Sequence, residues 1–503
     1  MLYDQLKRLK SGSDIRGIAV EGASRITLTD EAIRDITRAF GIWLRYRIGK
    51  ARVRIALGND SRISGPHIKQ IVTDTLTASG IDVLYTGLSS TPSMFLLLQD
   101  EAMGCEGSIM ITASHLPYDR NGLKFFTKDG GLEFTDIDDI VRLASDDFEH
   151  PCFPAPLNEG MYDEGSFMDQ YSAILVKSVE DACGKEPLKG SKIIVDAGNG
   201  AGGFFTEKVL KPLGADTEGS MYLNPDGMFP NHVPNPEDKK AIDGLSKQVV
   251  EVGADLGIIF DTDVDRSACV DKSGMEINRN ALIALLSAIL LADKPGAIVT
   301  DSVTSTHLTD FIEAHGGTHI RYKRGYRNVI DKCKELNAAG TYSPLAIETS
   351  GHAAFMDNYF LDDGAYVITR ILICKSKMNQ MGLHLADLIK DLKRPVEEDE
   401  VRISFVPECT DFRTEGQHII QDLMGKGLEG GVMEDVNYEG VRYNFASDIM
   451  GWLLIRNSVH DPVMPINFES DIAGGNKKMA KVLLDALRPY DSLDLTKLEE
   501  FTG

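Results

Sequence analysis

The sequence TASHLPYDRNGLK occupies residues 112–124, and its first residue ends the apolar run Ser108–Thr112. An apolar run of this length, followed by a loop rich in turn-forming residues, predicts a short buried strand that ends at the loop. We therefore expect Ser114 at the tip of that strand, where its hydroxyl group can take part in chemistry. A turn or capping serine is the more ordinary interpretation of this stretch alone, so its role depends on the rest of the chain.

Three segments of the chain share one plan, in which a strand that ends near an acidic residue is followed by a helix, a glycine-bearing turn and a second strand. They begin at Val53, Lys192 and Ala297. Units of this length form right-handed crossovers between parallel strands, with helices on both faces of the sheet. The predicted fold is therefore α/β, with three related α/β domains that have mixed, largely parallel sheets, plus a C-terminal α+β domain that lacks the repeat.

Three segments of altered composition separate the expected domains. They are a proline-rich linker, a polar Asp-Lys-Ser-Gly turn and a charged stretch that begins at Arg394. The predicted domains are, in order, residues 1–150, 157–270, 275–393 and 400–503.

The charge balance limits the possible partners. The 503 residues include 53 Lys and Arg against 76 Asp and Glu, for a formal net charge of −23. Such an excess of negative charge argues against nucleic acid or an anionic membrane surface as a partner. An anionic small molecule would need a local pocket of basic side chains.

The seven cysteines are scattered and contain no Cys-x-x-Cys pair, which predicts reduced thiols. The start of the chain lacks the apolar region of a secretory signal. The longest apolar run, near Ala281–Ala292, is too short to span a bilayer and predicts a buried helix. We expect a cytoplasmic protein.

Three aspartates alternate with other residues directly after the apolar run Leu256–Phe260. If this loop curls, the carboxylates of Asp261, Asp263 and Asp265 can converge on one hard cation. Crowding of three carboxylates is unfavourable unless a cation neutralises them. The predicted cation is Mg²⁺, and a solvated acidic turn is the alternative.

Four separated motifs resemble those of the α-D-phosphohexomutases, a family that interconverts sugar 1-phosphates and 6-phosphates. The motifs are TASH at 112–115, DTDVDR at 261–266, ETSGH at 348–352 and RNSVHDP at 456–462. Their order and spacing extend over most of the chain, which makes a chance match improbable. The first loop departs from the usual family pattern, since Leu116 replaces an asparagine and Tyr118 replaces a proline.

The resemblance implies a phosphohexomutase in which Ser114 carries the transferred phosphoryl group. Ser114 is then a ligand of Mg²⁺ together with Asp261, Asp263 and Asp265, and a hexose 1,6-bisphosphate acts as activator. The four domains would supply, in order, the phosphoryl group, the metal, sugar recognition and the site for the distal phosphate. We expect their loops to meet in one central cleft.

The resemblance also assigns the charged groups around the phosphoryl group. Arg16, within the sequence Ser-Asp-Ile-Arg-Gly, and Arg266 would neutralise its oxygens. Lys124 and His115 are the candidates for proton transfer, with Lys124 preferred.

Sugar and phosphate recognition falls on the remaining motifs. A carboxylate and a hydroxyl one residue apart, as in Glu348 and Ser350, can bind vicinal sugar hydroxyls from the same side of an extended loop. For Lys323 and Arg324, a solvated surface charge is the alternative. The substrate-binding residues implied are Arg266, Lys323, Arg324, Glu348, Ser350, His352, Arg456, Asn457 and Ser458.

Several alternatives stay open. The sugar could be glucose, mannose or, as in a phosphoglucosamine mutase, glucosamine, and the chain could be a monomer or a homodimer. The sequence Gly198–Gly203 satisfies the G-x-G-x-x-G pattern, with Asp216 downstream, so a dinucleotide-binding oxidoreductase is an alternative from another class. A metal-dependent phosphatase that hydrolyses phosphoserine and a non-catalytic binder of sugar phosphates are two more.

Overall fold

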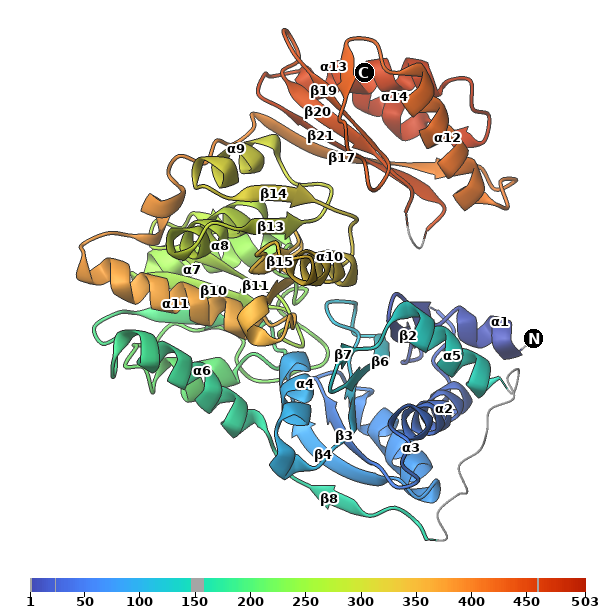
Figure 1. The fold of residues 1–503 in the computed structure, drawn as a ribbon, viewed down its shortest axis with the longest axis vertical. Coiled ribbons are helices and arrows are strands. Elements are labelled where there is room, and N and C mark those ends of the chain that lie inside the picture. The colour runs from blue at the N-terminus through green and yellow to red at the C-terminus, as the bar shows by residue number, and fades with distance from the viewer. Residues whose placement is uncertain (1, 23, 146–157, 459–460) are drawn as a thin grey trace. The chain divides into compact units, whose positions relative to one another are not determined.

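The computed structural model describes residues 2–22, 24–145, 158–458 and 461–503. The chain divides into two compact units. The first comprises Met1–Leu282 and Ser350–Asp387, and the second comprises Ile283–Thr349 and Leu388–Gly503. Figure 1 shows the helices and strands of both units. The predicted linker at residues 151–156, with Cys152, lies outside the described residues.

The first unit begins with an eight-stranded mixed sheet. Its strand order is β1-β2-β6-β5-β3-β4-β8, and β7 pairs with β6. The ladders of β3 with β4 and β5, and of β4 with β8, are parallel, whereas those of β6 are antiparallel. The strands are Lys10–Ser11 (β1), Asp14–Ile18 (β2), Arg54–Asn59 (β3), Asp82–Leu88 (β4), Gly107–Ile111 (β5), Arg120–Thr127 (β6), Gly130–Gly131 (β7) and Tyr162–Glu164 (β8).

Helices cover both faces of this sheet. From β3 the chain crosses to β4 in one direction and then to β5 in the other, so right-handed crossovers put α3 and α4 on opposite faces (Figure 1). The side chains of α2, α3 and α5 share one buried core with the sheet. The helices are Leu2–Lys7 (α1), Asp30–Ile48 (α2), Gly65–Ala78 (α3), Thr91–Gln99 (α4) and Phe134–Ala144 (α5), with a short 3₁₀ turn at Glu101–Met103.

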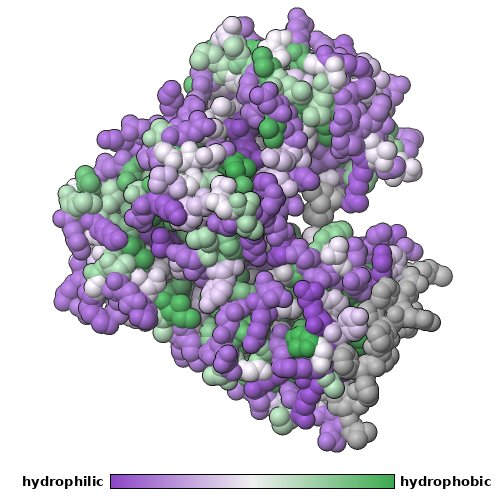
Figure 2. Space-filling view, in the orientation of Figure 1, coloured by the Kyte–Doolittle hydropathy of each residue, from purple (hydrophilic) through white to green (hydrophobic). Residues whose placement is uncertain are grey.

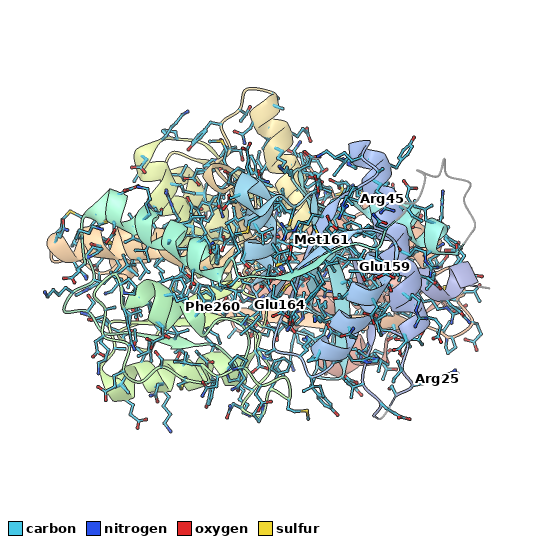
Figure 3. The ribbon with its side chains drawn as sticks, turned by 90° about the horizontal axis from the view of Figure 1, so that it is seen from below. Arg25, Arg45, Glu159, Met161, Glu164 and Phe260 are labelled. Carbon is cyan, nitrogen blue, oxygen red and sulfur yellow. The ribbon has the colours of Figure 1, made fainter. Side chains whose placement is uncertain are left out.

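The predicted strand before Ser114 is confirmed as β5, every residue of which is buried. Strand β8 shows that the first sheet includes residues from beyond position 150. It directly follows Met161 and ends at Glu164, both labelled in Figure 3. The amide of Val83 in β4 donates to the carbonyl oxygen of Met161, next to the parallel ladder of β4 and β8. The limits of the domains otherwise stay a prediction.

A second sheet of four strands completes the first unit, in the order β12-β11-β10-β9. Strands β9 and β10 are parallel, and the other two ladders are antiparallel. Helix α7 packs on β10, and α11, from late in the chain, packs on α6 and β11. The strands of this sheet are Ile193–Asp196 (β9), Leu256–Phe260 (β10), Ser267–Asp271 (β11) and Glu276–Ile277 (β12). The other elements of the first unit are Met168–Cys183 (α6), Lys239–Val252 (α7), Gly364–Gln380 (α11) and the strand Ala353–Phe355 (β16), which is not part of this sheet, with a π-helical turn at Thr206–Leu210 and a 3₁₀ turn at Met356–Asn358.

The second unit contains the third repeat. Strands β14, β13 and β15 lie side by side in that order, with parallel ladders. Helix α8 confirms the buried helix predicted near Ala281–Ala292. The elements are Arg279–Asp293 (α8), Ala297–Thr300 (β13), Thr306–Ala314 (α9), Thr318–Arg321 (β14), Tyr326–Ala338 (α10) and Leu345–Ile347 (β15), followed later in the chain by a 3₁₀ turn at Leu385–Ile389.

The C-terminal part of the second unit is an antiparallel sheet in the order β18-β19-β20-β21-β17-β22. Helices α12, α13 and α14 share one buried core with it. This is the α+β arrangement predicted, and the predicted fold class is confirmed. The elements are Glu397–Phe405 (β17), Phe412–Lys426 (α12), Gly431–Met433 (β18), Val441–Phe445 (β19), Gly451–Ile455 (β20), Val463–Ser470 (β21), Gly475–Leu487 (α13), Leu493–Asp494 (β22) and Thr496–Thr502 (α14).

The visible face of the molecule carries mostly hydrophilic residues, with hydrophobic residues in small groups (Figure 2). None of the helices in the described residues combines the length and apolar character needed to cross a membrane.

Candidate active site

Ser114 lies in the loop between β5 and β6 and is almost completely buried. Its backbone has a φ of +52°, in the left-handed region that non-glycine residues seldom adopt. In this conformation the hydroxyl donates to Asp261 Oδ2 at 3.1 Å and accepts from Arg266 Nη2 at 3.1 Å. The serine from the first sheet thus lies directly against the acidic loop of the second sheet.

The acidic loop between β10 and β11 curls as predicted. Buried Val264 has a φ of +66°, a strained value for a β-branched residue. This turn brings one carboxylate oxygen each of Asp261, Asp263 and Asp265 within 4.8 Å of one another. The three aspartates are buried, so the alternative of a solvated acidic turn is wrong.

The residues present fit a divalent cation. Asp263 Oδ1 and Asp265 Oδ1 are buried and receive no hydrogen bond among the described residues. Buried carboxylate oxygens without donors are the ligands that a hard cation such as Mg²⁺ prefers. Asp261, Asp263 and Asp265 would hold the ion, and Ser114 lies beside them.

The pKa values of Asp261 and Asp265 are shifted in opposite directions. Burial and the neighbouring carboxylates raise the pKa of Asp261 well above its usual value. Burial also acts to raise the pKa of Asp265, but the charges of Lys124 and Arg266, together with the neighbouring His352 and Asp261, outweigh it and hold that pKa well below its usual value. Asp265 is therefore the more acidic of these two carboxyl groups.

Lys124 projects from β6 into the cluster. Its ammonium donates to Asp263 Oδ2 at 3.0 Å and to Asp265 Oδ2 at 2.6 Å. Burial acts to lower the pKa of Lys124, but these two carboxylates outweigh it and raise the pKa well above its usual value.

Two histidines on either side of the cluster are neutral. His115 Nδ1 lies 3.4 Å from the Ser114 hydroxyl, and burial together with the charges of Arg266 and Arg16 lowers its pKa to about 2. Burial likewise lowers the pKa of His352 to about 3. A neutral imidazole next to a hydroxyl can exchange a proton with it.

Arg16 and Ser350 belong to the same group of side chains. Arg16, on β2, pairs with Asp14 at 2.8 Å and is close enough to act on His115. The Ser350 hydroxyl oxygen lies 2.9 Å from His352 Nδ1. The backbones of His352 and Arg266 form an isolated antiparallel β-bridge. The first unit thus gathers ten of the predicted site residues: Arg16, Ser114, His115, Lys124, Asp261, Asp263, Asp265, Arg266, Ser350 and His352.

The second unit gathers Lys323, Arg324, Glu348, Arg456 and Asn457. The amide of Gly325, next to Arg324, donates to Glu348 Oε1 at 2.6 Å. A pocket of about 300 Å³ has Lys323, Arg324 and Asn457 in its lining. Ser458 follows directly, whereas Val459 and His460 of the same motif lie outside the described residues.

Two acidic residues of this second group, Glu439 and Asp301, carry no predicted role. Glu439 accepts from the backbone amide of Arg324 at 2.5 Å and pairs with Arg456 at 3.4 Å. Burial and the nearby Asp301 raise the pKa of Glu348 to about 8. Glu439 directly precedes Gly440 and could have been suspected from its place before a strand, but its partners are far away in the sequence.

Arg456 is suited to an anion. It is 5% exposed, and burial lowers its pKa although Glu439 acts to raise it. Its Nε makes no hydrogen bond among the described residues. A buried guanidinium with an unused donor favours an additional acceptor, such as a phosphate oxygen. That all four domains share one cleft stays a prediction.

The glycines of the G-x-G-x-x-G sequence allow close packing of the backbone, which explains the pattern without a bound dinucleotide. A Cβ on Gly200 would lie 2.6 Å from the carbonyl oxygen of Thr262 in the acidic loop, and one on Gly203 would lie 2.2 Å from that of Leu223. The amide of Ala201 already donates to Thr262. The glycines allow two backbone segments to approach, so the dinucleotide alternative is not supported.

Comparisons with known proteins agree with this geometry. Three family models match the chain: phosphoglucomutase/phosphomannomutase alpha/beta/alpha domain I at residues 7–147, domain II at 169–274 and domain III at 278–395. A phosphoglucomutase of Neisseria meningitidis serogroup A is 32% identical over 461 residues, with 91% of this chain and 92% of that protein covered. A phosphomannomutase/phosphoglucomutase of Pseudomonas putida is 30% identical over 462 residues, with 91% and 90% covered.

A solved structure of a phosphoglucomutase/phosphomannomutase family protein from Burkholderia thailandensis has a TM-score of 0.78 and 26% identity, covering 96% of this chain and 97% of that one. Parafusin from Paramecium, at 17% identity and a TM-score of 0.73, shares the fold. On the strength of the matching domains and relatives, this chain belongs to the phosphoglucomutase/phosphomannomutase family of isomerases.

Proposed function

We propose that the protein is a phosphohexomutase that interconverts hexose 1-phosphate and hexose 6-phosphate through a phosphoserine at position 114 and a bisphosphorylated sugar. The observation that carries the proposal is the position of the Ser114 hydroxyl, 3.1 Å from both Asp261 Oδ2 and Arg266 Nη2. A carboxylate cluster for a metal and a guanidinium at the same oxygen are what phosphoryl transfer requires, because negative charge has to be stabilised on both sides.

The first unit would perform the transfer. Mg²⁺, held by Asp261, Asp263 and Asp265 with an oxygen of phosphorylated Ser114, would withdraw charge from the phosphoryl group. Arg266, which donates to the Ser114 hydroxyl, would stabilise the phosphoryl oxygens, with support from Arg16. Burial strengthens these interactions because little water screens them.

Proton transfer accompanies each phosphoryl step, since the accepting hydroxyl loses a proton and the leaving oxygen regains one. Lys124 and His115 are the proposed carriers. Lys124 lies at the carboxylates, and His115 lies 3.4 Å from the serine hydroxyl. Either position allows direct exchange with a hydroxyl group held at the metal.

The second unit would recognise the rest of the substrate. Arg456, with Arg324, Lys323, Asn457 and Ser458, would bind the phosphate that is not being transferred. Glu348, Ser350 and His352 are each proposed to bind sugar hydroxyls. The bisphosphate has to exchange its two ends between the transfer site and this phosphate site, so both sites accept either end of the sugar.

A direct test uses glucose 1-phosphate as substrate. We expect activity that requires Mg²⁺, needs no nicotinamide and is stimulated by catalytic amounts of glucose 1,6-bisphosphate, since that compound rephosphorylates enzyme whose intermediate has escaped. Inorganic phosphate should stay low during turnover. Phosphate release equal to the loss of substrate would show that water is the acceptor, and the phosphatase alternative would replace this proposal.

The same assay decides the sugar. We propose glucose and mannose as substrates, because one similar relative is named a phosphoglucomutase and another a phosphomannomutase/phosphoglucomutase. Parallel kcat/KM values for glucose, mannose and glucosamine 1-phosphates should favour the first two. A preference for glucosamine 1-phosphate would make the chain a phosphoglucosamine mutase.

The cytoplasmic location is also part of the proposal, and the six free cysteines of the described residues support it.

Replacement of Arg456 tests the phosphate site. Arg456→Ala should raise KM for glucose 1-phosphate about 10-fold to 100-fold, the effect of losing a charge-assisted hydrogen bond of about 1.5–3 kcal/mol. Arg402→Ala, which removes a half-exposed arginine from β17, is the matched control and should leave KM unchanged. An Arg456→Ala enzyme with the KM of the control would remove Arg456 from the phosphate site.

A further inference from the structure

Arg62, in the turn after β3, makes an unusual set of hydrogen bonds. Its side chain is completely buried. The guanidinium donates to four backbone carbonyl oxygens, those of Ser114 at 2.5 Å, Leu116 at 2.5 Å, Pro117 at 2.6 Å and Arg120 at 2.9 Å. All four carbonyls belong to the chain between Ser114 and the first residue of β6. One side chain therefore holds this loop along most of its length.

Asp60 completes the arrangement from the same turn. Its carboxylate forms a buried ion pair with Arg62 at 3.2 Å and accepts from the hydroxyl of Thr112 at 2.7 Å. The Thr112 hydroxyl oxygen in turn accepts from the amide of Ser114 at 2.9 Å. Asp60 thus orients the guanidinium and also reaches the other end of the loop, just before the serine.

These contacts address a specific difficulty of the loop. A left-handed backbone costs free energy at Ser114, and a residue in this conformation needs its surroundings to hold it there. The carbonyl of Ser114 itself is bound to Arg62, and its amide is bound through Thr112. Both sides of the strained residue are therefore fixed, which aims the hydroxyl at Asp261 and Arg266.

A loop of the first unit, residues 227–235, packs on the arginine. The ring of Phe229 lies 5.2 Å from the Arg62 guanidinium carbon. A Cβ on Gly227 would lie 2.4 Å from the amide nitrogen of Ile63, so this loop packs directly on the Arg62 turn. Further along the same loop, Asn235 Oδ1 accepts from Arg266 Nη1 at 3.4 Å. The loop that covers Arg62 therefore also touches the arginine at the serine hydroxyl.

We propose that Arg62, oriented by Asp60, is the positioning residue that keeps Ser114 aligned for phosphoryl transfer. The inference rests on the proposed role of Ser114 as phosphoryl carrier and extends it to residues that never touch the substrate. A misplacement of about 1 Å at a reacting atom can cost about 100-fold in rate. Loss of the guanidinium should therefore lower kcat far more than it changes KM.

The test compares three variants. Arg62→Met removes the guanidinium and keeps the apolar stem, and should lower kcat about 100-fold with KM for glucose 1-phosphate within about threefold of wild type. Arg62→Lys keeps the charge beside Asp60 but offers three donors in place of five, so kcat should recover about tenfold relative to Arg62→Met. Arg45→Met is the matched control.

Arg45 is a buried arginine of α2, labelled in Figure 3, that donates to the carbonyl of Ser79 at 2.7 Å. Its replacement should lower the melting temperature and leave kcat unchanged. Equal loss of kcat in Arg45→Met and Arg62→Met would overturn the inference, since burial alone would then explain both. Wild-type kcat in Arg62→Lys and Arg62→Met would overturn it as well, and Arg62→Lys decides the question if Arg62→Met does not fold.

A second readout separates this inference from the proposed function. Intact mass and peptide mapping after incubation with glucose 1,6-bisphosphate measure how fast Ser114 is phosphorylated. We expect rapid phosphorylation of the wild type and of Arg45→Met, and phosphorylation slowed about 100-fold in Arg62→Met. Phosphate found on another residue of the wild type would reject the proposed function, whereas phosphorylation of Ser114 at equal rates in all variants would reject only the role of Arg62.

Discussion

Ser114→Ala is expected to lower turnover of glucose 1-phosphate by at least about 10⁴-fold, because the hydroxyl that is proposed to carry the phosphoryl group is lost. Binding of the sugar phosphate should stay measurable by calorimetry, since the residues proposed for recognition are unchanged. The loop should keep its shape, because Arg62 binds its backbone and not the serine side chain.

Ser108→Ala is the matched control for this change. Ser108 is a buried serine of β5 that donates to the carbonyl of Met94 at 2.8 Å, away from the acidic cluster. Its replacement should affect stability and leave kcat near the wild-type value. If Ser114→Ala keeps activity within tenfold of wild type, Ser114 is not the phosphoryl carrier.

Asp263→Asn is expected to have the second largest effect, with kcat lower by about 1,000-fold and a higher Mg²⁺ concentration needed for half-maximal activity. A neutral amide replaces one of three carboxylates, and metal stabilisation of a phosphoryl transition state amounts to several kcal/mol. The Asp263 carboxylate also accepts from Lys124 and Thr91, so its loss disturbs the position of the lysine.

The measurement is a Mg²⁺ titration of activity together with calorimetric binding of Mg²⁺. Asp271→Asn, at the end of β11, is the control, because Asp271 is a buried aspartate that caps a turn through Ser273 and lies outside the cluster. It should leave the Mg²⁺ requirement unchanged. Full activity of the wild type in excess EDTA would contradict the metal site itself.

Short-range patterns predicted the parts of the fold that local sequence controls. The apolar run before Ser114 is β5, and the alternation in the acidic loop places its three carboxylates together. Both follow from periodicity and turn chemistry, which act over a few residues. The order and spacing of the four motifs are enough to indicate the family without the geometry of the site.

Those short-range patterns did not predict which distant segments pack together. The glycines at 198–203 match a nucleotide loop in sequence, and only the carbonyls of Thr262 and Leu223 against them reveal a packing role. Helix α11 follows the third repeat along the chain yet packs on α6 and β11 of the first unit. Such contacts join segments that lie beyond the few residues over which a local pattern acts.

The sequence by itself determined the family of this protein and predicts which residues carry its chemistry, because a phosphoryl carrier, a carboxylate set and basic loops have recognisable residue types and spacing. The tertiary structure alone decided how those residues are held. Asp60 and Arg62 read as an ordinary polar turn in the sequence, and their importance arises because parallel pairing of β3 with β5 brings that turn beside the Ser114 loop. The buried guanidinium then binds four carbonyls of the loop, only one of which, that of Pro117, also accepts from an amide of the loop, that of Arg120.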